Sequence, residues 1–191
     1  MKTFIVALIA ISFAGNEAFV AQGADRKRPG AKRKAEAVTA RVLTWKQTKT
    51  LIKSFKGEVV VLDVWSTSCL PCMREFPSFV ALQNEHKKGL RCISLNVDYF
   101  GDEHKPSDEL KEGVLDFLKR TKATTLNIIS SDADETIYEQ AHFSSIPAVF
   151  VFNRKGRLAK RFTDDPDQYG PKGFNYENHI TPLVEKLLGS K

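Results

Sequence analysis

The feature that most constrains the fold is the run Cys69-Leu70-Pro71-Cys72, which lies between an apolar segment and a helical one. Residues 59–65 read Val-Val-Val-Leu-Asp-Val-Trp, which is too uniformly apolar for a half-exposed strand and fits a strand buried on both faces. Two cysteines three residues apart on the first turn of a helix can close a small disulfide ring and reopen it without unfolding the chain. Proline suits that first turn, where its missing N–H is not needed. The sequence therefore predicts a strand, a cysteine pair and a helix in immediate succession.

The cysteine pair by itself leaves three kinds of site open. A helix N-terminus stabilises a thiolate through its unpaired N–H groups and its dipole, so Cys69 is expected to be the nucleophile of a redox-active pair. A CxxC run is also compatible with half of a zinc site or with a static disulfide. Cys92 is the one further cysteine in the sequence, and it falls in a predicted strand, where we expect a small buried side chain.

The hydrophobic pattern along the chain indicates one α/β domain. It predicts helices over residues 43–55, 71–86, 108–120, 134–142 and 181–189, and strands over residues 59–65, 90–97, 126–129, 148–152 and 157–162. Strand–helix–strand units followed by a hairpin and a last helix predict a central mixed sheet flanked by helices, parallel in its first part and antiparallel at its end. A chain of 191 residues can bury a core of ordinary size, and we expect this domain to span residues 41–191.

The first 24 residues are typical of a secretory signal peptide. A positive start at Met1-Lys2 precedes an apolar run over residues 4–14 and small residues at 21–24. The run is short for a membrane span, which needs about 20 apolar residues, although an uncleaved N-terminal anchor is the alternative. Export would place three cysteines in an oxidising compartment, too few for a disulfide-stapled fold, so we expect a catalytic pair in a periplasmic protein.

Residues 25–40 are expected to form a basic, disordered linker. Six lysines and arginines stand against two acidic residues in 25–36, which accounts for most of the chain's net charge of +6. Such a segment can contact an anionic membrane or nucleic acid, or can simply be solvated. We favour the solvated linker and expect no nucleic-acid partner.

Residues at fixed distances from the cysteine pair carry a family resemblance. Trp65 stands four residues before Cys69, Pro77 stands eight residues after it, and Ser145-Ile146-Pro147 precedes the predicted hairpin, where the thioredoxin fold has its cis-proline loop. With these residues the chain resembles the thioredoxin-fold proteins of the TlpA/ResA type, which are exported thiol-disulfide oxidoreductases. The resemblance runs from about residue 59 to residue 162.

The resemblance implies a catalytic set of two cysteines and two carboxylates. Cys69 would attack a substrate disulfide, and Cys72 would resolve the mixed disulfide. Thioredoxins have an aspartate that matches Asp63 beneath the second cysteine, where it helps to move a proton, whereas TlpA/ResA-type chains often lack it. Burial would raise the pKa of Asp63 and fit it to be the base for Cys72. Glu75 matches a cavity glutamate that tunes the cysteines or selects the substrate; a structural aspartate and a solvated glutamate are the alternatives.

The resemblance also implies a surface that binds an extended substrate segment. The Ile146-Pro147 bond should be cis, and the backbone before Pro147 should pair with the substrate. Ser68 stands where thioredoxins carry a tryptophan, so a flat aromatic beside the nucleophile is missing. The segments 98–107 and 164–176 are candidates to shape a groove, although we expect surface decoration. The residues expected to bind substrate are Trp65, Leu70, Pro71, Ile146 and Pro147.

These features together predict an exported thiol-disulfide oxidoreductase that reduces disulfides in extracytoplasmic proteins. Proline beside the second cysteine, with an aspartate beneath it, resembles the reducing end of the family. We expect a monomer with no metal or other cofactor, kept reduced by a membrane thiol reductase. Three alternatives keep the fold: a copper-delivery protein of the Sco type, which normally shows CxxxC and a distal histidine; a peroxiredoxin-like peroxidase; and a non-enzymatic adaptor.

Overall fold

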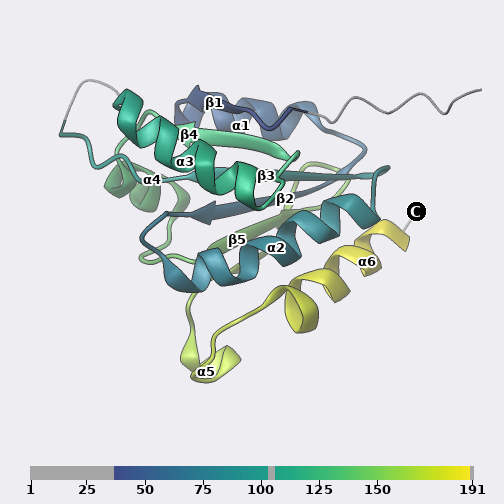
Figure 1. The fold of residues 1–191 in the computed structure, drawn as a ribbon. Coiled ribbons are helices and arrows are strands. Elements are labelled where there is room, and N and C mark those ends of the chain that lie inside the picture. The colour runs from purple at the N-terminus through teal and green to yellow at the C-terminus, as the bar shows by residue number, and fades with distance from the viewer. Residues whose placement is uncertain (1–36, 103–105, 190–191) are drawn as a thin grey trace, which may run out of the picture. The chain divides into compact units, whose positions relative to one another are not determined.

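A computed structural model describes residues 37–102 and 106–189 of the chain (Figure 1). The predicted signal peptide and residues 25–36 of the predicted linker lie outside the described residues. In chain order the elements are β1 (Ala40–Leu43), α1 (Trp45–Ser54), β2 (Val59–Trp65), α2 (Leu70–Glu85), β3 (Leu90–Asn96), α3 (Asp108–Arg120), β4 (Leu126–Ser130), α4 (Asp134–Ala141), β5 (Ala148–Phe152), β6 (Leu158–Phe162), α5 (Pro166–Tyr169), the π-helical turn η1 (Tyr176–Ile180) and α6 (Thr181–Gly189).

The strands form one mixed sheet in the order β1-β4-β3-β2-β5-β6. The first four of these are parallel, whereas β5 runs antiparallel to β2 and β6 antiparallel to β5. This arrangement confirms the predicted α/β class, parallel first and antiparallel at the end. It also places β2, which leads to the cysteine pair, in the interior of the sheet.

Strand β1 is a strand that the sequence pattern did not predict, as it did not predict the short helix α5 and the turn η1. The predicted linker ends at residue 40 and the predicted helix begins at residue 43, but Ala40–Leu43 pairs in parallel with β4, with Ala40 opposite Asn127. Helix α1 therefore begins later, at Trp45, where Thr44 caps it by accepting a hydrogen bond from the backbone N–H of Gln47. A short strand half-exposed at a sheet edge has little apolar pattern, so only its tertiary pairing identifies it.

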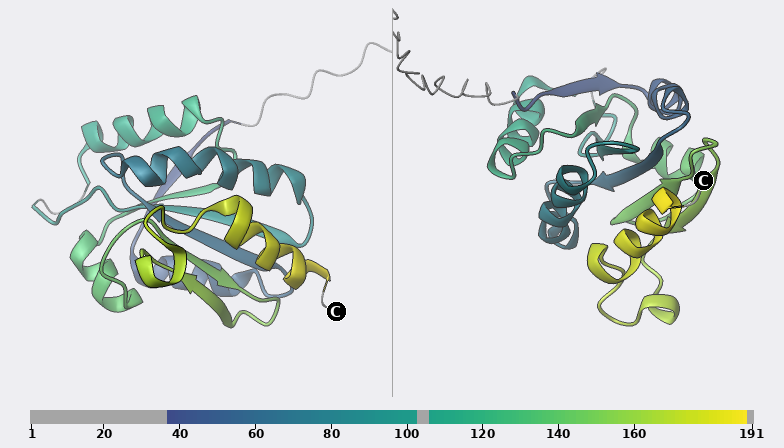
Figure 2. Two further views of the ribbon diagram at one scale, coloured as in Figure 1. Left: turned by 90° about the horizontal axis from the view of Figure 1, so that it is seen from below. Right: turned by 90° about the vertical axis from the view of Figure 1, so that its right-hand side faces the viewer.

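Helices cover both faces of the sheet, and β2 is buried between them (Figure 2). Side chains alternate along a strand, so Val59, Val61 and Trp65 pack with residues of α2, α3 and α6. Val60 and Val64 pack with α1 and α4 on the opposite face. Asp63 has the same parity as Trp65 and therefore points to the α2 side. No helix in the described ranges combines the length and the apolar character that a membrane span requires.

Candidate active site at the start of helix α2

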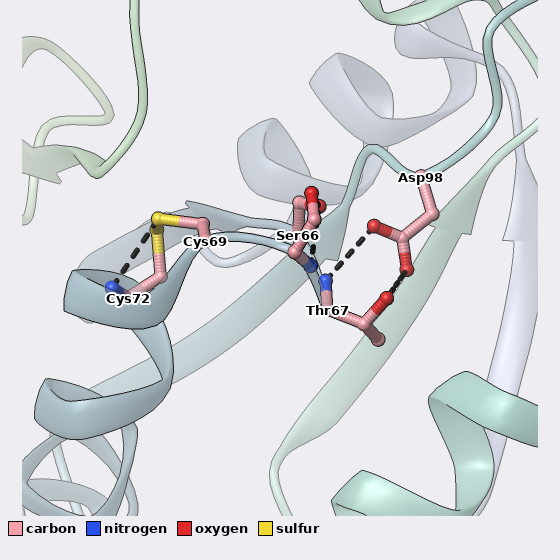
Figure 3. The surroundings of a disulfide bond; sticks show 6 residues. Ser66, Thr67, Cys69, Cys72 and Asp98 are labelled. Carbon is pink, nitrogen blue, oxygen red and sulfur yellow. Dashed lines mark hydrogen bonds between the residues drawn. A yellow bond between two sulfur atoms is a disulfide. The ribbon is translucent and has the colours of Figure 1, made fainter.

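Cys69 and Cys72 form a disulfide at the N-terminus of α2 (Figure 3). Their Cα atoms lie 5.3 Å apart. Cys69 is the N-cap of the helix, and its Sγ accepts a hydrogen bond from the backbone N–H of Cys72 over 3.3 Å. Both side chains are largely buried, at 9% and 4% exposure. Because unpaired N–H groups at a helix start stabilise negative charge, this position favours a thiolate on Cys69 once the disulfide opens.

The loop that carries Cys69 is fixed by the end of β3. Asp98 accepts two hydrogen bonds from Thr67, from the backbone N–H over 2.9 Å and from the hydroxyl over 2.8 Å (Figure 3). Asn96 donates a further bond to the same carboxylate over 3.0 Å. The hydroxyls of Ser66 and Ser68 lie 2.7 Å apart. These bonds hold the backbone that positions Cys69, and the sequence pattern gave no sign of the role of Asp98.

A pocket of about 620 Å³ opens beside the cysteine pair. It is bounded by β2, the first turn of α2, the loop before β5 and the segment that follows β6. Its lining residues are Asp63, Pro71, Cys72, Arg74, Glu75, Ile146, Pro147, Val149, Asp164, Pro171, Lys172, Gly173, Phe174, Asn175 and Tyr176. The pocket thus brings together most residues that the sequence singled out. The Ile146-Pro147 bond is cis, as predicted.

Asp63 lines this pocket from the central strand β2, and the residue is only 5% exposed. The pKa of its carboxyl is raised from 3.8 to about 7, mainly by burial and to a lesser extent by the charge of Glu75. A hydrogen bond from the Tyr176 hydroxyl acts against this shift. A carboxyl with a pKa near neutrality can both accept and release a proton there, which is what the proposed base of Cys72 must do.

The segment between β6 and α6 completes the pocket. The backbone N–H of Tyr176 donates to Glu75 Oε2 over 3.1 Å, and its hydroxyl donates to Asp63 Oδ2. Tyr176 itself is 2% exposed. The sequence named residues 164–176 as a possible groove but favoured decoration, and Tyr176 was not identified as a partner of the two carboxylates. Tyr176 and Asp63 are 113 residues apart, so no local pattern reveals their contact.

The three remaining residues expected to bind substrate differ in their exposure. Leu70 is 75% exposed and Pro71 is exposed beside the disulfide, as a surface contact requires. Trp65 is fully buried, and its ring lies 4.9 Å from that of Phe76 and 4.8 Å from that of Phe117. A side chain enclosed in this aromatic cluster is not available to a substrate. The expectation for Trp65 is therefore corrected: it packs beneath the active-site helix.

A smaller groove of about 270 Å³ lies on the Ser68 side of the cysteine pair. Phe100, from the segment 98–107, is 67% exposed and lines this groove together with Ser68. The sequence lacks the aromatic residue that thioredoxins carry directly before the nucleophile. In this fold the aromatic ring at that groove is Phe100, which comes from the loop after β3.

Cys92 does not line the pocket. Cys92 is fully buried on β3, where burial raises the pKa of its thiol. This agrees with the expected small core residue. Within residues 37–102 and 106–189, no three His, Cys, Asp or Glu side chains gather in a way that could hold a metal ion.

Comparison with known proteins identifies relatives that are named thiol-disulfide oxidoreductases. Sporulation thiol-disulfide oxidoreductase A of Bacillus subtilis is 26% identical over 106 residues, 55% of this chain and 59% of that protein. The thiol-disulfide oxidoreductase ResA of Bacillus subtilis is 29% identical over 114 residues, 59% of this chain and 56% of that protein. The chain spans somewhat more than half the length of these curated relatives.

Solved structures agree in fold. A thiol:disulfide interchange protein of the thioredoxin family from Chlorobium tepidum has a TM-score of 0.53 at 19% identity, covering 71% of this chain and 83% of that chain. A secreted Mycobacterium tuberculosis disulfide oxidoreductase has a TM-score of 0.52 at 17% identity, covering 70% and 85%. The fold is therefore thioredoxin-like, and the TlpA/ResA-type resemblance is confirmed. The model of the Redoxin family matches residues 30–178, so this chain belongs to the Redoxin family.

Proposed function

We propose that this chain is an exported thiol-disulfide oxidoreductase that reduces disulfides in extracytoplasmic proteins. The observation that carries the proposal is the Cys69–Cys72 disulfide at a helix start, with Cys72, Asp63 and Pro147 lining one pocket. A static structural disulfide has no need of a buried carboxyl with a pKa near neutrality. The relatives named as thiol-disulfide oxidoreductases support the same class of reaction.

The proposed cycle moves two electrons from the cysteine pair to the substrate. The Cys69 thiolate attacks one sulfur of the substrate disulfide, and the other substrate sulfur leaves as a thiolate. Cys72 then loses its proton to Asp63 and attacks the Cys69 sulfur. This step closes the Cys69–Cys72 disulfide and releases the second substrate sulfur as a thiolate. Return to the dithiol requires an external reductant, which we propose is a membrane thiol reductase.

The surface around the pair fits an extended substrate segment. Ile146 and Pro147 are half-buried at the pocket wall, where we propose that the backbone before Pro147 pairs with the substrate. Leu70, between the two cysteines, and Phe100, from the loop after β3, are exposed apolar side chains, and we propose that they contact the same segment. A monomer would suffice for this cycle, because one chain supplies both cysteines and the base.

The function is tested by the reduction of a protein disulfide. The full chain should accelerate the reduction of insulin by dithiothreitol, measured as turbidity of the released B chain. The matched control is Cys92→Ala, which removes the buried cysteine outside the pocket and should keep the activity per folded molecule. A rate equal to that of dithiothreitol alone, with the pair accessible to reduction, would contradict the proposal.

Asp63→Asn is expected to change two pH profiles. The folded protein binds more protons than the unfolded chain between pH 3.8 and about 7, so wild-type stability falls as the pH rises through this range. The variant carries no charge at position 63, so above pH 7 its free energy of unfolding should exceed that of wild type by about 4 kcal/mol at most. It should also lose the wild-type rise in reduction rate near pH 7, because the proposed base of Cys72 is gone.

Both readouts have a control on the surface. Asp116→Asn changes a carboxylate that is 63% exposed on α3, and should leave the two profiles as in wild type. Urea unfolding and the insulin assay across pH 5 to 9 measure them. If Asp63→Asn kept the wild-type pH dependence of reduction, Asp63 would not be the base.

A further inference from the structure

We propose that Tyr176 is a positioning residue that holds both pocket carboxylates and stabilises the ionised form of Asp63, so that Asp63 can take the proton of Cys72. This inference rests on the proposed function, because it assigns Asp63 as the base of Cys72. It concerns a residue in the segment between β6 and α6, far in sequence from the cysteine pair.

Tyr176 contacts the two carboxylates through two different groups. Its hydroxyl donates to Asp63 Oδ2 on the central strand, and its backbone N–H donates to Glu75 Oε2 on α2 over 3.1 Å. The phenol ring is buried, with its centroid 6.0 Å from that of Phe79. One residue thus joins the strand and the helix that carry the predicted proton-handling groups.

The backbone of Tyr176 is itself held in place. Asn175 caps the turn η1, since its side chain accepts from the backbone N–H of Asn178 over 2.8 Å. The backbone N–H of Asn175 donates to Nδ1 of His179 over 3.1 Å. The phenol therefore reaches Asp63 from a backbone that has little freedom to move.

The hydrogen bond favours the ionised form of Asp63. A donor to a carboxylate stabilises its charge, and in this site the Tyr176 hydroxyl lowers the pKa of Asp63 against the larger effect of burial. Burial and the charge of Asp63 raise the pKa of Tyr176 well above 10, so the phenol stays protonated and remains a donor. Tyr176 bonds to Oδ2, so we take Oδ1 as the oxygen that receives the Cys72 proton in the shared pocket.

The other groups around Asp63 raise its pKa, stay neutral or lie at the rim of the pocket. Glu75 from α2 raises the pKa of Asp63 by its charge, and Cys92 from β3 is a buried thiol whose own pKa is raised. Cys72 shares the pocket as the group to be deprotonated. The charged residues at the pocket rim, all exposed, are Arg74, Asp164 and Lys172. Tyr176 is thus the neighbour that holds the proton affinity of Asp63 down.

Tyr176→Phe tests this role, because it removes the hydroxyl and keeps the ring. We expect the pKa of Asp63, followed by carbon NMR of its carboxyl in the full chain, to rise. The resolving step, followed as release of a preformed mixed disulfide on Cys69, should slow about tenfold at pH 7 and recover at higher pH. An unchanged Asp63 pKa and an unchanged pH profile would overturn the inference.

Tyr169→Phe is the matched control. Its hydroxyl is also buried in the same segment but has no hydrogen-bond partner among the described residues, so its loss should leave both readouts unchanged. In the Asp63→Asn background, Tyr176→Phe should have no further effect on the profile. A full tenfold loss in that background would show that Tyr176 acts otherwise than through Asp63.

One measurement needs no variant of Tyr176. In the wild-type protein the Cζ shift of Tyr176 should follow the titration of Asp63 with the same midpoint, and independence of the two would overturn the inference. Failure of the proposed function is distinguishable: Asp63→Asn would then resolve mixed disulfides like wild type, whereas the NMR titrations would still report whether Tyr176 holds the carboxyl.

Discussion

Replacing Cys69 by serine is expected to abolish catalysed reduction of protein disulfides. A serine hydroxyl is not ionised near neutral pH, and the stabilisation that the start of α2 offers to a thiolate cannot compensate. The loss of a nucleophile of this kind reduces turnover by a factor on the order of 10³ or more. The insulin assay, run against dithiothreitol alone, measures it.

The same variant separates an enzyme from an adaptor that merely uses a thioredoxin-like surface. Cys92→Ala should retain wild-type turnover. This result would show that activity depends on the Cys69–Cys72 pair and is not lost whenever a thiol is removed. A Cys69→Ser/Cys72→Ser protein that still complements a deletion strain would favour the adaptor. Substantial insulin reduction by Cys69→Ser would show that the nucleophile has been assigned to the wrong residue.

Replacing Cys72 by serine is expected to stop the cycle halfway. Cys69 can still attack, but the thiol that would displace the substrate is missing, so the mixed disulfide accumulates. Multiple turnover should fall to background while about one substrate molecule per chain becomes covalently bound. Mass spectrometry under non-reducing conditions measures the adduct, and dithiothreitol should release it.

The site of the adduct checks the order of the two cysteines. Digestion of the trapped complex should place the substrate on Cys69, whose sulfur accepts the hydrogen bond of the helix N-terminus. Cys69→Ser should give no comparable adduct on Cys72, which is only 4% exposed. Trapping on Cys72 instead would reverse the proposed roles.

Local patterns were sufficient to predict the unit that carries the chemistry. The strand Val59–Trp65 and the helix Asp108–Arg120 have the predicted bounds, because a doubly buried strand and an amphipathic helix with Ser107 as its cap are encoded in neighbouring residues. The CxxC at the helix start and the cis peptide bond before Pro147 followed from short motifs and the family resemblance.

Contacts between distant segments were the part that could not be predicted. Strand β1 exists because Ala40–Leu43 pairs with β4. Its four residues are too few for an alternation of apolar and polar side chains to identify a strand. Tyr176 reaches Asp63 from a loop rich in glycine and proline, whose path is set by the whole fold. Trp65 was expected at the substrate surface, but alternation along β2 directs it into the aromatic cluster under α2.

The equilibrium reduction potential of the Cys69–Cys72 pair tests the central claim most directly. The folded protein without residues 1–24 would be equilibrated with dithiothreitol or glutathione buffers, and the oxidised fraction measured by thiol alkylation and mass spectrometry. A reductant with Pro71 beside Cys72 and a buried Asp63 should have a potential near that of thioredoxin, about −270 mV. A value near −120 mV, typical of a strong oxidant, would contradict the proposal that this protein reduces its substrates.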